Sequence, residues 1–319
     1  MRLLKKLFGK QAVSQGIVSI SFLSDGFALA VSKYTNNKHQ LVFCGFFRVN
    51  DTHELYNLLD KLSSNYQLAN YECCLVLPAE EYRRINMETP NVADEELAAA
   101  IRWKIADLID YPITQAALDY YQSPLPIRAL NRKFIDVIVS SKDVLNPKID
   151  LCQSAGLNLT IIDIQETSLR NLATLLPENK RGVAVLHLQE YTGTILIQKD
   201  ATIYLSRHFD VGYKKLGLDQ DLHDPNELSS EQSFLTLEIQ RSLDYVENYF
   251  GLPPVSSLVT IPIPEHTQTL LNILNNSHGI TARIMDISAI IDCDILIDDA
   301  TQCYCTPVIG ATLRYAIKS

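Results

Sequence analysis

The chain has no long uninterrupted hydrophobic run, and this absence excludes an obvious membrane-spanning helix. A span needs roughly 18 consecutive apolar residues. The longest candidate, Ile284 to Ile297, is interrupted by three aspartates. The basic start, MRLLKKLFGK, lacks the continuous apolar core of a secretory signal, because a glycine and a lysine end its apolar stretch. We therefore expect the protein to stay in the cytoplasm.

Positive charge is also scarce. The chain has 28 basic against 37 acidic residues and a formal net charge of −9. A nucleic-acid-binding protein needs a basic face that displaces counterions from phosphates, so this class is disfavoured. At 319 residues, with 47% hydrophobic and 20% charged residues, the chain is that of a globular protein too long for one typical core. Two lobes or domains are expected.

Familiar catalytic and metal motifs are missing. There is no GxGxxG, Walker A or HExxH motif, and no Ser/His/Asp or Cys/His set at a recognisable spacing. The seven cysteines are an odd number, and most lie in strand-like apolar segments. Cys303 and Cys305 resemble half of a metal site, but on a strand their thiols would share a face without a nearby partner set. We predict buried reduced thiols and no metal site.

A repeated pattern is the most informative feature that is present. The segment GIVSISFLSDGFALAVSKYTNNKHQLVFCGFFRVN, from Gly16, contains three alternating apolar stretches and leads to a helical stretch. The segment GVAVLHLQEYTGTILIQKDATIYLSRHFDVG, from Gly182, repeats this arrangement. Period-2 alternation broken at turn residues predicts a three-strand meander. The repeat predicts an α/β fold with two similar lobes facing a cleft, at residues 1–178 and 179–319.

The first lobe contains a predicted insertion at about residues 79–156. A strand around Tyr82–Met87 is followed by the helix DEELAAAIRWKIADLI, whose acidic first turn suits the positive end of the helix dipole. Strands over Leu118–Gln122 and Lys133–Ser140 and a helix over Lys142–Ala155 complete a compact αβ unit. The last predicted element of the chain is a short helix after Pro307.

Four segments in a fixed order carry a family resemblance. They are AAAIRWKIADLIDYPITQAALDYY, AGLNLTIIDIQETSLRNLATLL, EIQRSLDYVENYFG and VIGATLR. Together they span most of the chain and resemble the PilM-type actin-like proteins of bacterial type IV pilus assembly. The resemblance is greatest to the MshI branch, from the mannose-sensitive haemagglutinin (MSHA) pilus system.

The resemblance implies a two-lobed actin-like fold of the FtsA/PilM type, with the insertion as the subdomain typical of FtsA. It also implies a cytoplasmic protein that is recruited to the inner membrane. There it would bind the short N-terminal tail of a bitopic PilN/MshJ-like protein, in a groove between the first subdomain and the insertion. Other pilus platform proteins are further expected partners.

The same resemblance locates the expected nucleotide cleft, which is altered here. Actin-like ATPases use glycine-containing hairpin turns that let backbone N–H groups approach phosphates, with carboxylates that hold Mg²⁺. Nucleotide-binding relatives have Asp-Ile-Gly-Ser-type signatures at both turns. At the first turn Ser19 and Ser21 stand for the Asp and the Gly, and at the second His187 and Gln189 do so.

The late strand of the cleft is altered as well, since Pro262 and Pro264 stand where a glycine pair is expected. Asp25 and Glu190 remain as displaced carboxylates. We interpret Asp25 as a hairpin-turn residue and Glu190 as a solvated turn residue, each in preference to a metal ligand. We therefore expect no catalysis and no cofactor, with ATP and Mg²⁺ disfavoured and weak nucleotide binding left open.

A partner surface is expected on the insertion helix. Trp103, the only tryptophan, lies off the apolar stripe of this helix beside Arg102, and Tyr111 and Tyr120 follow in sequence. Aromatic and arginine side chains are enriched in interface hot spots. These four residues are candidate partner contacts, and packing of Trp103 against the insertion sheet is the alternative.

Residues 1–10 combine four basic with four large apolar side chains. Such a segment can rest on an anionic membrane surface or act as a solvated terminus, and the sequence does not separate the two.

A non-catalytic scaffold is thus the leading functional hypothesis. The alternatives are an actin-like ATPase with an altered site and a GspL-like cytoplasmic domain of type II secretion. The third is disfavoured because no membrane span follows in this sequence.

Overall fold

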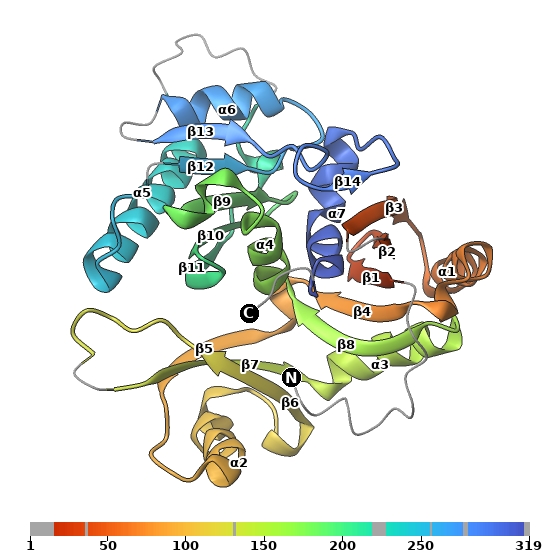
Figure 1. The fold of residues 1–319 in the computed structure, drawn as a ribbon, viewed down its shortest axis with the longest axis horizontal. Helices are drawn as coiled ribbons and strands as arrows, with labels where there is room; N and C mark the ends of the chain where they lie inside the picture. Colours follow the sequence, from red (N-terminus) through yellow and green to blue (C-terminus); the bar gives the residue numbers. More distant parts are fainter. Residues whose placement is uncertain are drawn as a thin grey trace.

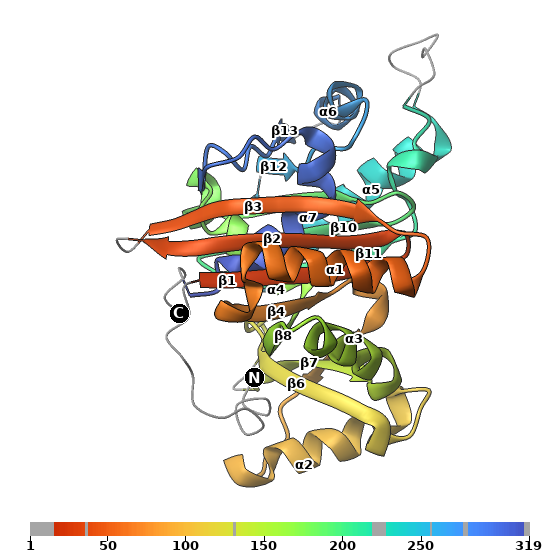
Figure 2. The same ribbon diagram turned by 90° about the vertical axis from the view of Figure 1, so that its right-hand side faces the viewer.

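The fold was obtained as a computed structural model, shown in Figures 1 and 2. It describes residues 16–35, 38–129, 132–218, 228–255, 257–276 and 280–315.

A six-stranded sheet forms the body of the first lobe. Its strands are, in spatial order, β14 (Asp292–Cys293), β3 (Lys38–Arg48), β2 (Gly26–Thr35), β1 (Gly16–Leu23), β4 (Glu72–Leu77) and β8 (Asn158–Ile164). The first three strands in sequence pair antiparallel, which confirms the first predicted meander. Helices α1 (Thr52–Tyr66) and α3 (Lys142–Ser154) cover the outer face, where Val18, Ile20 and Phe22 of β1 are buried.

The second lobe repeats this arrangement, as the duplicated pattern predicts. Its five strands are, in spatial order, β11 (Thr202–Phe209), β10 (Gly193–Lys199), β9 (Val183–Leu188), β12 (Ser257–Thr260) and β13 (Thr281–Ile284). Helices α5 (Ser230–Phe250) and α6 (Thr267–Asn275) bury their apolar faces against the outer side of this sheet. The predicted actin-like duplication is therefore present.

The insertion is a separate three-stranded sheet with one helix. Its strands have the order β5 (Arg83–Glu88), β7 (Phe134–Ser141) and β6 (Ala116–Gln122), and α2 (Asp94–Ile105) packs on them. Ile101 and Ile105 of α2 are fully buried against the sheet, as their spacing predicts.

The connection between β6 and β7 reaches the second lobe. The backbone N–H of Ile127 donates a hydrogen bond to the carbonyl of Tyr249 at the end of α5, at 3.0 Å. Figure 1 shows this arm extending beneath α5. The insertion therefore contacts both lobes.

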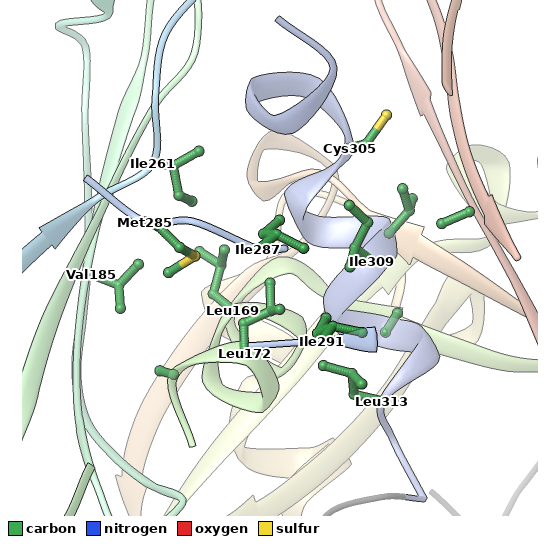
Figure 3. Packing of buried hydrophobic residues seen from close by; sticks show 14 of the residues in the cluster. Leu169, Leu172, Val185, Ile261, Met285, Ile287, Ile291, Cys305, Ile309 and Leu313 are labelled. Atoms are coloured by element: carbon green, nitrogen blue, oxygen red, sulfur yellow. The ribbon is translucent and has the colours of Figure 1, made fainter. Parts of the chain in front are cut away.

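Two helices, α4 (Gln165–Ala173) and α7 (Asp299–Thr312), lie between the lobes. Their side chains join those of both sheets in one hydrophobic cluster, with Leu169 and Leu172 on α4 and Ile309 on α7 (Figure 3). The helices approach closely at Gly310, where a Cβ would lie 2.1 Å from the carbonyl oxygen of Ser168. Only glycine permits this approach without a shift of the backbone.

Helix α7 corrects two predictions. Cys303 and Cys305 were expected on a strand but lie in this helix, and the predicted helix after Pro307 in fact starts at Asp299 and contains the proline. An apolar run without clear periodicity does not distinguish a strand from a helix, which explains the first error. Proline usually marks the start of a helix rather than its interior, which explains the second. Both thiols are buried and free.

No helix in the described part of the chain is long and apolar enough to cross a membrane.

Candidate site between the two lobes

The predicted first phosphate turn is a tight hairpin between β1 and β2. Leu23 pairs with Gly26 across it, which confirms Asp25 as a turn residue. Ser19 and Ser21 lie on β1 with the same parity as Ile17, whose side chain belongs to the cluster between the lobes. Both serines are buried. The strand therefore presents packed side chains toward α7 at the two positions expected to correspond to the Asp and Gly of nucleotide-binding relatives.

At the second turn, His187 on β9 is buried deep between the lobes. Its Nε2–H donates to the carbonyl of Cys303 at 3.0 Å, and its Nδ1 accepts from Gln165 Nε2 at 3.2 Å. Complete burial lowers the pKa of His187 to about 4. The ring is therefore neutral, with its proton on Nε2, and it ties the second lobe to both central helices.

Pro307 explains why His187 finds an acceptor there. A proline has no N–H, so the carbonyl four residues earlier in a helix loses its usual donor. That carbonyl is the one of Cys303, to which His187 donates. A proline inside a helix costs stability because it removes a backbone hydrogen bond. Here the hydrogen bond from His187 of β9 offsets part of that cost.

A second set of contacts spans the mouth of the space between the lobes. Arg48 Nε, on β3, pairs with Asp25 at 3.2 Å, and its NH2 group contacts the Tyr304 hydroxyl at 3.2 Å. The Tyr304 ring stacks on Phe46, with the ring centroids 4.2 Å apart. The hydrogen bond with Asp25 is the main cause of a raised pKa of Arg48, which keeps its charge.

Glu190, at the β9–β10 turn, belongs to the second lobe and also contacts Tyr304. Its carboxylate pairs with Lys214 at 2.9 Å and accepts longer hydrogen bonds from the hydroxyls of Tyr213 and Tyr304. Glu190 is a turn residue, as interpreted, but its carboxylate has three partners and is only partly exposed, so it is not simply solvated. We call Asp25, Arg48, Glu190, Tyr213, Lys214 and Tyr304 the mouth cluster. Gln189 lies beside it and accepts from Thr192 at 3.1 Å.

A hydrogen-bond chain runs from His187 to the insertion. Gln165 donates to Thr194 at 3.2 Å, Thr194 donates to His208 Nδ1 at 2.8 Å, and His208 Nε2 donates to Glu166 at 3.0 Å. The Tyr82 hydroxyl, at the entrance to the insertion, donates to the other oxygen of Glu166. The chain links the first lobe, the second lobe and the insertion through α4.

Glu166 is the centre of this chain and is fully buried. Burial raises the pKa of its carboxyl, but the hydrogen bonds from His208 and Tyr82 outweigh burial and leave the pKa lowered. Burial and the adjacent Glu166 raise the pKa of Tyr82 well above its usual value. An ionised carboxylate with a neutral phenol donor is the arrangement that results.

The insertion residues predicted to bind a partner do not form one exposed group. Arg102 NH1 donates to the carbonyls of Ile113 and Ala116 at 3.3 Å each, which ties α2 to its own subdomain. Tyr111 and Tyr120 are partly buried against the insertion core.

Trp103 alone is open, with 84% of its surface exposed. The alternative of Trp103 packing on the insertion sheet is wrong, because the side chain points to the opposite side of α2 from Ile101 and Ile105. The predicted membrane contact of residues 1–10 lies outside the described residues.

Sequence reasoning missed Arg48, Tyr213, Lys214 and Tyr304 of the mouth cluster and Tyr82, Glu166 and His208 of the chain. Arg48 and Tyr304 are far apart in sequence, and neither belongs to a spaced motif. The nearest signal in the sequence is the segment Cys303-Tyr304-Cys305, in which the two thiols suggest a function and the tyrosine does not. Within the described residues, no group of three or more His, Cys, Asp or Glu is placed to hold a metal ion.

Solved structures with a similar fold support this architecture. The structure of a PilM–PilN type IV pilus biogenesis complex matches with a TM-score of 0.69 and 14% identity, covering 95% of this chain and 99% of that one. A Bacteroides thetaiotaomicron protein with an actin-like ATPase fold and unknown function matches at 0.51 and 12% identity, covering 88% and 93%. The cytoplasmic domain of EpsL, from the type II secretion system of Vibrio cholerae, matches at 0.49 and 13%, covering 95% and 99%.

At these identities the first two matches establish the fold alone, which is actin-like. A search of curated proteins finds no significant match. The model of the type IV pilus assembly protein PilM family matches residues 40–243, which is more than half of the sequence, and the chain therefore belongs to that family.

Proposed function

We propose that this protein is a non-catalytic actin-like scaffold of a type IV pilus assembly platform of the MSHA type. It is cytoplasmic and peripheral to the inner membrane, and it binds the cytoplasmic N-terminal tail of a PilN/MshJ-like membrane protein. Family membership supports the pilus role, and the similarity of its segments to the MshI branch supports the MSHA assignment.

The main support for the absence of catalysis is that the carboxylates at both predicted phosphate turns form ion pairs within the chain. Asp25 is paired with Arg48 and Glu190 with Lys214. A Mg²⁺-nucleotide needs carboxylates free for the ion and close backbone N–H groups for the phosphates. Buried Ser19, Ser21 and His187 occupy the signature positions. These residues do not fit a Mg²⁺-nucleotide.

Thermal unfolding with and without millimolar Mg-ATP tests this part of the proposal. A ligand at 100 times its Kd stabilises a protein by about 2.7 kcal/mol, which raises Tm by several degrees. We expect no shift. A clear Tm increase that disappears in Glu190→Gln or Asp25→Asn would instead favour the altered ATPase.

The partner assignment rests on the PilM–PilN complex, whose fold this chain shares. In Figure 2 the insertion lies below β8, the edge strand of the first-lobe sheet, so a groove between the insertion and the first lobe is the expected location for the tail. Titration calorimetry with two synthetic tails, one PilN-like and one MshJ-like, separates the parts of the proposal. Tighter binding of the MshJ-like tail supports the MSHA type. Binding of the PilN-like tail alone retains the scaffold and removes the MSHA assignment, and binding of neither tail removes the partner.

A further inference from the structure

Two of the cysteines, Cys44 and Cys305, contact each other where α7 packs on the first-lobe sheet. Cys44 and Phe46 are two residues apart on β3, so both side chains point to the face of the sheet that α7 covers. On α7 the Tyr304 ring stacks on Phe46, and the next residue, Cys305, brings its thiol to Cys44. Figure 3 shows the sulfur of Cys305 directed from α7 toward the strands of this sheet. The two thiols are therefore already side by side in the folded protein.

The two thiols differ in their access to solvent. Cys305 is fully buried, whereas Cys44 is only partly buried. The two thiols hydrogen-bond to each other, and the backbone N–H of Gly45 donates to the Cys305 sulfur. Burial raises the pKa of the Cys305 thiol well above its ordinary value, and the contact with Cys44 raises it further. Cys305 therefore stays protonated, and Cys44 is the thiol that a small molecule in solution reaches.

A second pair of thiols shows what is particular to the first. Cys73 on β4 and Cys152 on α3 also hydrogen-bond to each other, but both are fully buried. Because a thiol must meet an oxidant before it can react, exposure separates two pairs that are otherwise alike. Cys303 lies two residues before Cys305 on α7, and its thiol donates to the carbonyl of Leu188 in the second lobe at 3.6 Å. It provides a control thiol on the same helix.

We propose that Cys44 and Cys305 form a site of reversible oxidation, at which hydrogen peroxide converts the two thiols into a disulfide. Cys44 releases its proton to water, and its sulfur attacks one peroxide oxygen. The O–O bond breaks, which gives a sulfenic acid on Cys44 and a first water. The Cys305 sulfur then attacks the sulfenic sulfur, the S–O bond breaks, and the hydroxyl leaves as a second water with the Cys305 proton. The two thiols lose two electrons in total, and the peroxide gains them.

The disulfide fixes α7 to β3 beside the mouth cluster. Helix α7 carries Tyr304 of that cluster and the Cys303 carbonyl that His187 of β9 contacts, so this helix connects the lobes. The loop closed between Cys44 and Cys305 contains the whole second-lobe sheet, and closing so long a loop restricts the unfolded chain. The oxidised protein is therefore the more stable form, with its lobes held together. This inference is independent of the proposed tail binding and of the absence of catalysis.

Peptide mapping of the full chain tests the site. The folded protein is treated with an excess of hydrogen peroxide, the remaining thiols are alkylated in denaturant, and the chain is digested without reduction. We expect a disulfide that joins Cys44 to the α7 peptide and that dithiothreitol removes, while Cys73 and Cys152 are recovered as alkylated thiols. The oxidised chain should have a Tm about 5 °C above that of the reduced chain.

Alanine variants identify the partner of Cys44. Cys44→Ala and Cys305→Ala should each lose both the disulfide and the rise in Tm, whereas Cys303→Ala should keep both. Circular dichroism checks that each variant is folded, and Cys44→Ala tests the pair from its exposed side if the change at the buried position unfolds the protein. A disulfide that persists in Cys305→Ala, or one that joins Cys44 to Cys293, would overturn the proposal. So would the absence of any disulfide, equal oxidation of the fully buried pair, or a Cys44 disulfide that links two chains.

Discussion

At the scale of single residues, His187 occupies a position where phosphate binding was expected. Instead, its side chain connects β9 to α4 and α7 through hydrogen bonds. Burial lowers its pKa to about 4 from the usual 6.5, so the imidazole of the folded protein is mostly neutral at pH 5 and above. Between pH 6.5 and 4 the unfolded chain binds a proton that the folded protein does not. Stability is therefore lost as pH falls through this window. The expected loss from this residue is about 2 kcal/mol between pH 7.5 and 5.

Urea unfolding at pH 7.5 and 5.0 measures this loss. In His187→Gln, which does not titrate, the stability difference between the two pH values should shrink by about 2 kcal/mol. His53→Gln changes an exposed residue of α1 and should keep the full difference. An unchanged difference in His187→Gln would mean that the imidazole is protonated or solvated in the folded protein.

At the scale of elements, the crossing of α4 and α7 depends on a single glycine. Gly310→Ala should improve helix propensity by about 1 kcal/mol, but its Cβ would lie 2.1 Å from the Ser168 carbonyl oxygen. We expect the clash to outweigh the gain in helix propensity, so that the free energy of unfolding falls by about 2 kcal/mol in total. The midpoint of guanidinium unfolding measures it.

Gly45→Ala on β3 is the matched control for this crossing. A Cβ there would meet only the Phe47 and Phe43 rings, at 3.2 Å or more, and these rings can shift. A Gly310→Ala protein as stable as the wild type would show that the two helices are free to move apart.

At the scale of the whole molecule, the mouth cluster joins the two lobes at the position of the expected nucleotide cleft. Tyr304→Phe keeps the ring stacked on Phe46 but removes the hydroxyl shared with Arg48, Tyr213 and Glu190. We expect a cost of about 1 kcal/mol and faster amide exchange at the β1–β2 and β9–β10 turns.

Tyr56→Phe, which removes a 3.4 Å hydrogen bond to the Ser154 carbonyl, serves as the control within one lobe. Exchange at the two turns should be unaffected by it. If Tyr304→Phe also leaves both turns unchanged, the mouth cluster does not hold the lobes together.

Much of the fold follows from the sequence, because side-chain periodicity is a local property. Alternation predicted both meanders, and the spacing of Ile101 and Ile105 predicted the buried side of α2. The segment around Cys303 was assigned to a strand because an apolar run without a clear period fits either element. Whether a helix could tolerate Pro307 depended on His187, a residue from another strand.

The sequence by itself determined two meanders and a separate αβ unit between them, since each is written in neighbouring residues. Only the tertiary structure decided that Asp25 and Glu190 are engaged by Arg48 and Lys214 through a cluster centred on Tyr304. It alone also decided that Trp103 is open. Such pairings depend on which distant elements the folded backbone brings within a few ångströms of one another, and no local spacing encodes that proximity.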